Sequence, residues 1–128
     1  MLFVCVGNSG RSQMAEAFFN HLTKGKARAM SAGTNPASKV DPTVIELMKE
    51  LGIDLSSHYP KKLTAEMLEG ADKVITMGCG VEQACPAILA PTEDWGIDDP
   101  KGQPVEKMRD IRNQIKARVE KLLKEMGI

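Results

Sequence analysis

The first twelve residues constrain most strongly what this chain can fold into. Leu2 to Val6 form a short and uninterrupted apolar run, which is typical of a strand buried on both faces of a sheet. The run stops at Gly7, and apolar residues recur at helical spacing from Ser12 onward. The opening therefore predicts a buried strand, a glycine-containing turn and a helix, as in proteins with a parallel sheet.

The same alternation continues along the chain. Further strands are predicted over 28–32, over 73–77 and, as a short piece, near 95–97. The apolar residues between Val105 and Met126 repeat every three or four positions, with charged residues between them. This pattern predicts one long amphipathic helix that covers the core.

Two shorter helices have recognisable ends. Asp41 and Pro42 are a typical N-cap and first helical residue, and Gly52 is expected as the glycine that ends this helix. Thr64 is expected to cap a second, short helix that closes at Gly70.

These elements predict an α/β fold in which residues 1–128 form a single domain. We expect a doubly wound sheet of about four parallel strands with helices on both faces, which suits a chain of 128 residues. Ligands of such sheets bind outside the carboxyl ends of the strands. Cys5, the segment around Cys79 and the loop beyond Trp95 all follow predicted strands, so we expect them to meet at one edge.

Composition excludes several classes of function. The 17 Lys and Arg residues balance 17 Asp and Glu residues, which argues against a nucleic-acid binder. No apolar run approaches the roughly 20 residues that span a bilayer, and no signal peptide is evident. Three cysteines in such a chain suggest reactive thiols. We expect a cytoplasmic monomer without nucleic-acid or membrane partners.

The segment from Cys5 to Ser12 carries the strongest indication of function. A loop between a strand and a helix N-terminus directs backbone N–H groups at one point, with the positive end of the helix dipole behind them. Such a loop fits a tetrahedral oxyanion, and the planar guanidinium of Arg11 can hold two of its oxygens. The residues expected to bind the anion are Val6, Gly7, Asn8, Ser9, Gly10 and Arg11.

The same N–H groups, helix dipole and neighbouring Arg11 favour the thiolate form of Cys5, which could then attack the anion. Ser12 could donate a hydrogen bond to this sulfur. The alternative is that Cys5 is a small core residue and Arg11 an exposed charge at the start of a helix. The strand before the loop, the glycines within it and the helix after it favour the anion site.

The loop resembles the phosphate-binding loop Cys-x5-Arg-Ser of the low-molecular-weight protein tyrosine phosphatase superfamily, and residues 4–16 are more similar to the arsenate reductases of that superfamily. Further motifs follow in the same order, and the resemblance spans nearly the whole chain. They are Ser31-Ala32-Gly33-Thr34, Cys85-Pro86 and Asp94-Trp95-Gly96-Ile97-Asp98-Asp99-Pro100. The resemblance implies reduction of arsenate to arsenite, with Cys5 as the nucleophile and weak phosphatase activity beside it.

By the same resemblance, Asp99 is the general acid that protonates the departing oxygen, and Asp98 is the weaker candidate. Phosphatases of the superfamily carry aromatic residues just after the corresponding Asp-Pro, where this chain has residues 101–103, Lys-Gly-Gln. A pocket without stacking walls favours a small oxyanion, arsenate or phosphate, over a phosphopeptide.

The other two cysteines distinguish a reductase from a phosphatase. By resemblance, Cys79 attacks Cys5 and releases arsenite, and Cys85 then attacks Cys79. The resulting Cys79–Cys85 disulfide is reduced by an external thiol. Alternatives are inert buried thiols or a zinc site, and the spacing of this pair is unlike that of structural zinc sites, so no metal site is expected.

Two departures from the thioredoxin-coupled relatives matter. The position of Cys79, about one residue late, also resembles relatives that use a low-molecular-weight thiol such as mycothiol, so thioredoxin, a glutaredoxin-type protein or a small thiol could be the reductant. Some relatives bind potassium through Asn, Glu, Ser and Asp. Asn8, Glu16 and Ser31 match, but Lys61 replaces the aspartate, so no potassium requirement is expected.

The sequence leaves two other functions open. The first is a low-molecular-weight protein tyrosine phosphatase that hydrolyses phosphotyrosine or aryl phosphates through a phosphocysteine at Cys5. The second is a non-enzymatic oxyanion or redox sensor that switches through Cys79 and Cys85. The paired distal cysteines and the absence of aromatic residues at 101–103 favour reduction.

Overall fold

The computed structural model describes residues 1–5, 7–77, 92–97 and 102–127. The strands are β1 (Leu2–Cys5), β2 (Met30–Gly33), β3 (Val74–Thr76) and β4 (Thr92–Asp94). The helices are α1 (Arg11–Thr23), α2 (Pro42–Lys49), α3 (Ala65–Glu69) and α5 (Val105–Glu125).

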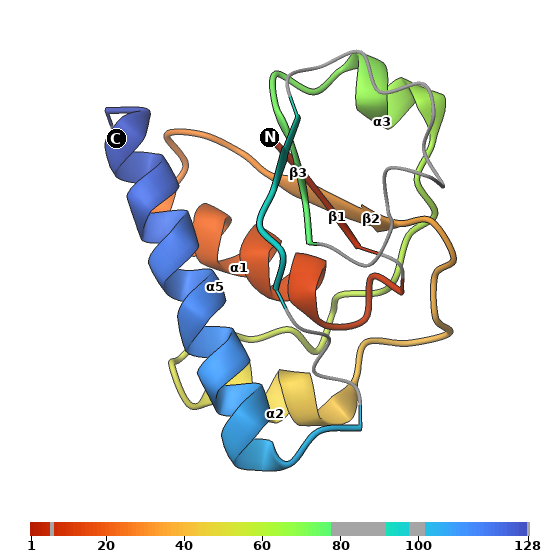
Figure 1. The fold of residues 1–128 in the computed structure, drawn as a ribbon, viewed down its shortest axis with the longest axis vertical. Coiled ribbons are helices and arrows are strands. Elements are labelled where there is room, and N and C mark those ends of the chain that lie inside the picture. The colour runs from red at the N-terminus through yellow and green to blue at the C-terminus, as the bar shows by residue number, and fades with distance from the viewer. Residues whose placement is uncertain (6, 78–91, 98–101, 128) are drawn as a thin grey trace.

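The strands form one sheet in the order β2-β1-β3-β4, and all three pairs are parallel. Helices α1 and α5 cover one face, and the short α3 lies on the other (Figure 1). This is the predicted doubly wound α/β architecture with helices on both faces.

Strand β1 is buried on both sides because its side chains alternate between two cores. Phe3 and Cys5 point into the large core shared with α1 and α5, whereas Leu2 and Val4 point into the smaller core beneath α3. In the large core, the ring of Phe3 packs 6.0 Å from that of Phe19 and 5.7 Å from that of Trp95. Both faces therefore hold β1, and with it Cys5, in place.

The predicted caps are present. Asp41 Oδ1 accepts a hydrogen bond from the Thr43 amide at 2.9 Å, and Thr64 Oγ1 accepts one from the Met67 amide at 3.2 Å. At the other end of α2, Gly52 has a φ of +77° and donates to Lys49 O at 2.9 Å. This is the left-handed residue of a Schellman-type end, as the sequence predicts.

The prediction of a strand near 95–97 is wrong. The fourth strand is Thr92–Asp94, and Trp95 lies just beyond it, although its amide still donates to Thr76 O at 2.9 Å. The sequence Thr-Glu-Asp has no apolar residue, so an edge strand made of it carries no hydrophobic signal. Trp95 and Ile97 are each 5% exposed because they pack into the core next to this strand.

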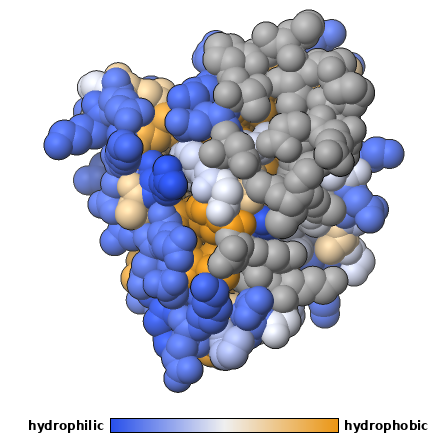
Figure 2. Space-filling view, in the orientation of Figure 1, coloured by the Kyte–Doolittle hydropathy of each residue, from blue (hydrophilic) through white to orange (hydrophobic). Residues whose placement is uncertain are grey.

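The long helix α5 is amphipathic, as predicted. Most of its apolar residues face the core, and the side turned outward is hydrophilic (Figure 2). Among the helices described, none combines the length and the apolar character needed to cross a membrane.

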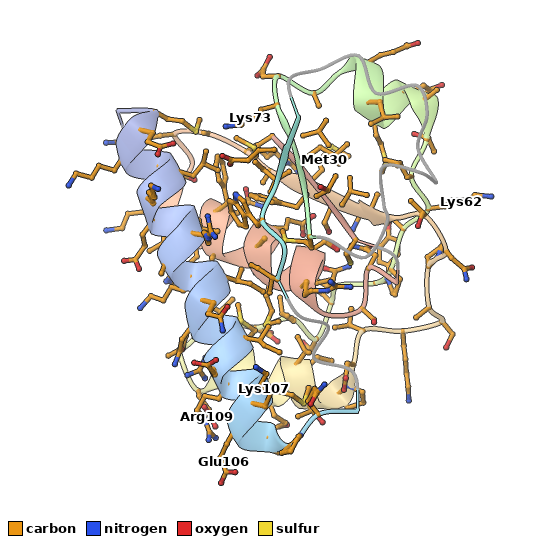
Figure 3. The ribbon with its side chains drawn as sticks, in the orientation of Figure 1. Met30, Lys62, Lys73, Glu106, Lys107 and Arg109 are labelled. Carbon is orange, nitrogen blue, oxygen red and sulfur yellow. The ribbon has the colours of Figure 1, made fainter. Side chains whose placement is uncertain are left out.

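An ion-pair cluster joins α2 to α5. Glu50, just after α2, accepts hydrogen bonds from Arg109 Nη2 at 2.8 Å and from Arg112 Nη1 at 2.7 Å. Arg109 extends from the first turns of α5 (Figure 3). These hydrogen bonds, the one from Arg109 first, lower the pKa of Glu50 to about 2. The Arg112 side chain is only 6% exposed, and Glu50 provides an opposite charge for this buried guanidinium.

We expect this cluster to make the stability of the fold change with pH in the acid range. Because the folded pKa of Glu50 is depressed, its contribution is complete above the unfolded value of about 4.3 and is lost as the pH falls towards 2. Glu50→Gln should lower the melting temperature by a few degrees at pH 7, and the difference should shrink between pH 5 and pH 2.5. Glu46→Gln, one turn earlier on α2, is the control. A difference of equal size at both ends of this range would contradict the assignment.

Candidate active site

Cys5 is the last residue of β1, at the point where the strand order reverses. Strand β2 lies on one side of β1, and β3, which comes later in the chain, lies on the other. Open α/β sheets bind their ligands at such switch points, outside the carboxyl ends of the strands. Cys5 is 2% exposed. The segment between Cys5 and α1 (residues 6–10) is called the anion loop here, and residues 7–10 of it are described.

In the described part of the anion loop, the Asn8 amide points towards Cys5. The carbonyls of Gly7 and Ser9 accept hydrogen bonds from the amides of Ala37 and Asp41, each at 2.9 Å. In a planar trans peptide, the N–H of the next residue points the opposite way. The Asn8 amide accordingly donates to Cys5 Sγ at 3.2 Å.

Asn8 holds an unusual backbone conformation with its own side chain. Its φ of +50° lies in the left-handed region, which asparagine tolerates better than most residues. Oδ1 accepts from the Lys61 amide at 2.8 Å, and Nδ2 donates to Ser12 Oγ at 2.6 Å. The side chain thus ties the loop to α1 and to the segment around Lys61.

Ser12 lies directly beside the sulfur. Its Oγ is 2.8 Å from Cys5 Sγ, and its side chain is fully buried. The side-chain Nδ2 of Asn8 donates to this oxygen, and a Cys5 thiolate can only accept, so in that form of Cys5 the hydroxyl hydrogen of Ser12 is directed to the sulfur. The sulfur therefore faces two donors, an amide N–H and a hydroxyl.

Arg11, the first residue of α1, spans the carboxyl ends of the sheet. Nη1 donates to Met77 O and to Ile97 O, each at 2.9 Å, and the residue is 3% exposed. Met77 is two residues before Cys79, and Ile97 is two residues before Asp99. Arg11 thus brings together the ends of both segments that carry the other predicted catalytic residues.

The N-terminus of α1 is suited to an anion. Its N-cap is Gly10, and no side chain of the described residues caps this end. The first-turn amides and the positive end of the helix dipole favour negative charge at this position. The structure thus brings Cys5, Arg11, Ser12 and residues 7–10 together. Four predicted site residues, Val6, Cys79, Cys85 and Asp99, lie outside the described residues.

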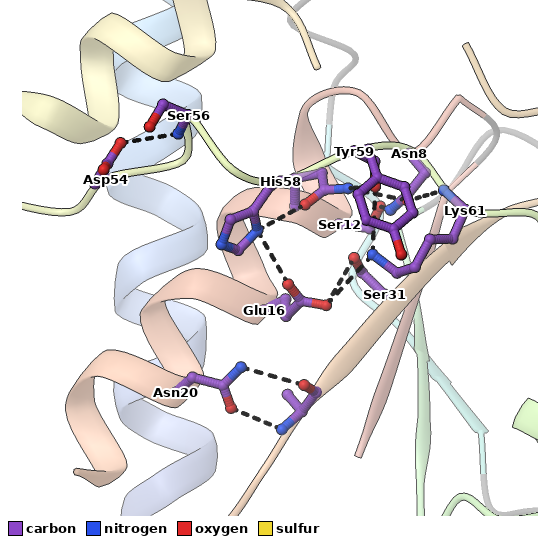
Figure 4. A network of polar contacts seen from close by, with 12 residues as sticks. Asn8, Ser12, Glu16, Asn20, Ser31, Asp54, Ser56, His58, Tyr59 and Lys61 are labelled. Atoms are coloured by element: carbon purple, nitrogen blue, oxygen red, sulfur yellow. Dashed lines mark hydrogen bonds and ion pairs between the residues drawn. The ribbon is translucent and has the colours of Figure 1, made fainter. Parts of the chain in front are cut away.

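A polar network behind the loop supports it (Figure 4). The Glu16 carboxylate, whose side chain is 10% exposed, accepts from Ser31 Oγ at 3.1 Å and lies 3.3 Å from His58 Nδ1. Lys61 Nζ approaches the same carboxylate at 3.9 Å. In this part of the chain, the positive charge beside the Glu16 carboxylate comes from the ammonium group of Lys61, where a bound cation could otherwise supply it.

Sequence reasoning missed two members of this network. Gln13 and His58 join Glu16 to the anion loop, although neither has a motif that marks it. The structure marks Gln13 by its burial, because a fully buried polar side chain on the first turn of α1 needs hydrogen-bond partners. Among the described residues, no group of three or more His, Cys, Asp or Glu side chains could hold a metal ion.

A separate cavity lies at the other end of β1. It has a volume of about 560 Å³ and is bordered by Leu2, Met30, Met67 and residues near them. Cys5 is at the opposite end of the same strand, so this cavity is not part of the site around the sulfur.

The site has a buried cysteine at a switch point, a loop amide and a serine hydroxyl at its sulfur, and an arginine at the start of the next helix. These features define a protein with a cysteine-based oxyanion site. Comparison with known proteins gives the family. Residues 1–127 match the family described as low molecular weight phosphotyrosine protein phosphatase. The chain belongs to this family.

Its relatives include proteins named as arsenate reductases. The chain is 40% identical to a putative arsenate reductase of Halobacterium salinarum over 98% of this chain and 91% of that protein. It is 40% identical to the glutaredoxin arsenate reductase of Synechocystis over 99% and 98% of the two chains. A solved structure described as an arsenate reductase in the phosphate binding state superposes with a TM-score of 0.86, at 40% identity and over 97% and 95% of the chains.

The position of Lys61 leads to a test of cation binding. Lys61→Met removes the ammonium beside the buried Glu16 carboxylate, and we expect it to cost on the order of 1 kcal/mol of stability. Potassium chloride should raise the melting temperature of this variant more than choline chloride does, because potassium can take the vacated position. The wild type should respond equally to both salts.

The matched control is Lys62→Met. Lys62 is exposed and points outward at the edge of the molecule (Figure 3). This control should behave as the wild type does in both salts. A potassium-specific rise in the melting temperature of the wild type would contradict the role given to Lys61.

Proposed function

We propose that this protein reduces arsenate to arsenite by nucleophilic attack of Cys5. The observation that carries the proposal is the pair of donors at the sulfur, the Asn8 amide at 3.2 Å and the Ser12 hydroxyl at 2.8 Å. Both stabilise a thiolate, and the N-terminus of α1, which no side chain of the described residues caps, offers an oxyanion position next to it. The similarity to arsenate reductases supports arsenic as the centre attacked.

The first step forms a bond between sulfur and arsenic. The Cys5 thiolate attacks arsenate, which Arg11 and the amides of residues 6–10 hold, and one oxygen leaves as water. Asp99 supplies a proton to this oxygen as the general acid. Ser12 then stabilises Cys5 when its sulfur becomes the leaving group.

The second step transfers two electrons. The Cys79 thiolate attacks Cys5 Sγ, a disulfide forms, and the electron pair of the sulfur–arsenic bond stays on arsenic, which leaves as arsenite. Cys85 then attacks Cys79, which frees Cys5 and leaves a Cys79–Cys85 disulfide. Two thiols are oxidised for each arsenic that is reduced from the +5 to the +3 state.

An external reductant must reopen that disulfide. We propose a glutaredoxin-type protein or thioredoxin, with a small thiol as the alternative that the experiment below distinguishes. The relative from Synechocystis is named for glutaredoxin, which supports a dithiol protein as donor. The cycle needs free thiols, which the cytoplasm maintains, so we place the protein there.

Hydrolysis of aryl phosphates is the second candidate function. The family is described by its phosphotyrosine phosphatases, and Cys5 and Arg11 would serve a phosphocysteine intermediate equally well. The residues after Pro100 are Lys-Gly-Gln and offer no aromatic wall for a phosphotyrosine ring. We therefore propose phosphatase activity as a weak side reaction.

One set of assays tests these assignments. Arsenate is supplied with thioredoxin and its reductase, then with glutaredoxin and glutathione, then with mycothiol, and arsenite is quantified in each. We expect arsenite with at least one donor and at least a thousandfold loss in Cys5→Ser, because the nucleophile is removed. Cys79→Ser should stop after at most one turnover. Efficient hydrolysis of aryl phosphate without arsenite under any donor would establish the phosphatase instead.

A further inference from the structure

The cavity at the amino end of β1 is open although the strands beneath it face a core. Its volume of about 560 Å³ lies within the range of small-molecule sites. Met30, at the start of β2, is 45% exposed, whereas Ala32 on the same face of that strand is fully buried in the smaller core. Figure 3 shows Met30 at this end of the sheet. The smaller core therefore ends in an apolar hollow.

The walls of this cavity are apolar and rich in methionine. Leu2, which is 2% exposed, lies at its floor beside Met30, and Met67 and Ala71 line the side towards α3. Met1 is a third methionine in the lining. Thioether side chains adapt to the shape of a ligand, and their sulfur atoms contact aromatic rings favourably. These walls favour an aromatic body over a branched aliphatic one.

The rim of the cavity carries more negative than positive charge. Glu66 lies on the first turn of α3, and Asp72 lies between this helix and β3. Of the described residues that border the cavity, Arg28 alone is cationic, and it precedes β2. All three side chains are exposed. Within the described parts of the chain, neither carboxylate takes part in a hydrogen bond or an ion pair.

The register of the sheet separates the guanidinium from the carboxylates. Strand β1 lies between β2 and β3, and Leu2 pairs with Met30 on one side and with Val74 on the other. Arg28 comes two residues before Met30. Asp72 comes two residues before Val74, so its backbone is about 10 Å from that of Arg28, across the start of β1. The negative charge is therefore on the side of α3 and β3, and the positive charge is on the side of β2.

We propose that this cavity binds a small aromatic amine in its protonated form. The ring lies on Leu2 among the methionine side chains, and the ammonium group faces Glu66 and Asp72. Two carboxylates against one guanidinium favour a cation over an anion. The cavity has room for a whole two-ring molecule, which suits a free amine better than a single side chain of a partner protein. The site is at the opposite end of β1 from Cys5 and is independent of the proposed function.

Tryptamine, an indole with a protonated aminoethyl group, is a suitable probe. The protein is labelled with carbon-13 in the methyl groups of its eight methionines, and their NMR signals are followed while tryptamine is added. Met30→Leu and Met67→Leu assign the two signals of interest. We expect these signals to shift together with a Kd between about 0.05 and 1 mM. The signals of Met14 and Met48, which are buried in the large core, should not move.

Charge variants test the class of ligand. Glu66→Gln combined with Asp72→Asn should raise the Kd for tryptamine about fivefold or more at low salt, and Arg28→Met should lower it. Indole-3-acetate has the same ring and a negative charge, so it should bind the wild type about fivefold more weakly than tryptamine, or weaker still. Glu69→Gln is the matched control, because Glu69 is an exposed carboxylate of α3 outside the cavity, and it should leave the Kd unchanged.

Three results would overturn the inference. They are unmoved Met30 and Met67 signals up to about 10 mM tryptamine, equal binding of indole-3-acetate, and an unchanged Kd in the double variant. Cys5→Ser should bind tryptamine as the wild type does, because Cys5 does not border this cavity. Loss of binding in that variant would place the amine at the sulfur and would also refute the inference. The proposed function is tested separately, by arsenite formation.

Discussion

The orientation of one side-chain amide, that of Asn8, determines how the site is built. The Lys61 amide holds Asn8 Oδ1, so Asn8 Nδ2 is directed to Ser12. The Ser12 hydroxyl lies 2.8 Å from the sulfur of Cys5 and donates its hydrogen to it when the sulfur is a thiolate, which can only accept. The same side chain stabilises a left-handed backbone at Asn8 that turns its amide to the sulfur as well. Reversing this side-chain amide would turn its N–H donors towards the Lys61 amide and would remove the hydrogen bond that Asn8 donates to Ser12.

The fold supplies rigid support for these contacts. Strand β1 packs on both faces, and the loop after it is held through its carbonyls by residues 34–41. Arg11 fixes the chain near Met77 and Ile97, so one guanidinium coordinates the ends of two later segments. Positions far apart in the sequence therefore converge at the carboxyl ends of the strands, where a parallel sheet binds its ligands.

Much of this could be predicted from the sequence. The buried strand, the caps at Asp41 and Thr64 and the long helix follow from patterns that are local in sequence. Strand β4 could not be found in this way, because the sequence Thr-Glu-Asp has no apolar residue that would mark a strand at the edge of the sheet. The contact of Ser12 with Cys5 is local, seven residues apart, and was expected from the loop motif.

The roles of Gln13 and His58 are of a different kind. Gln13 and His58 are 45 residues apart. Their hydrogen bonds depend on which side-chain atoms of Gln13 and Asn8 face a backbone acceptor or donor. No pattern of residue types encodes that choice. The substitution of a lysine at position 61 was visible in the sequence, but its approach to Glu16 at 3.9 Å is a property of the folded chain.

The most direct test of the central claim, that Cys5 opens a two-electron reduction, is a single turnover without any external donor. The fully reduced protein is mixed with one equivalent of arsenate, and both arsenite and remaining thiols are counted. Close to one arsenite per protein molecule should form and two of the three thiols should be lost, with neither change in Cys5→Ser. Three intact thiols and no arsenite in the wild type would contradict it.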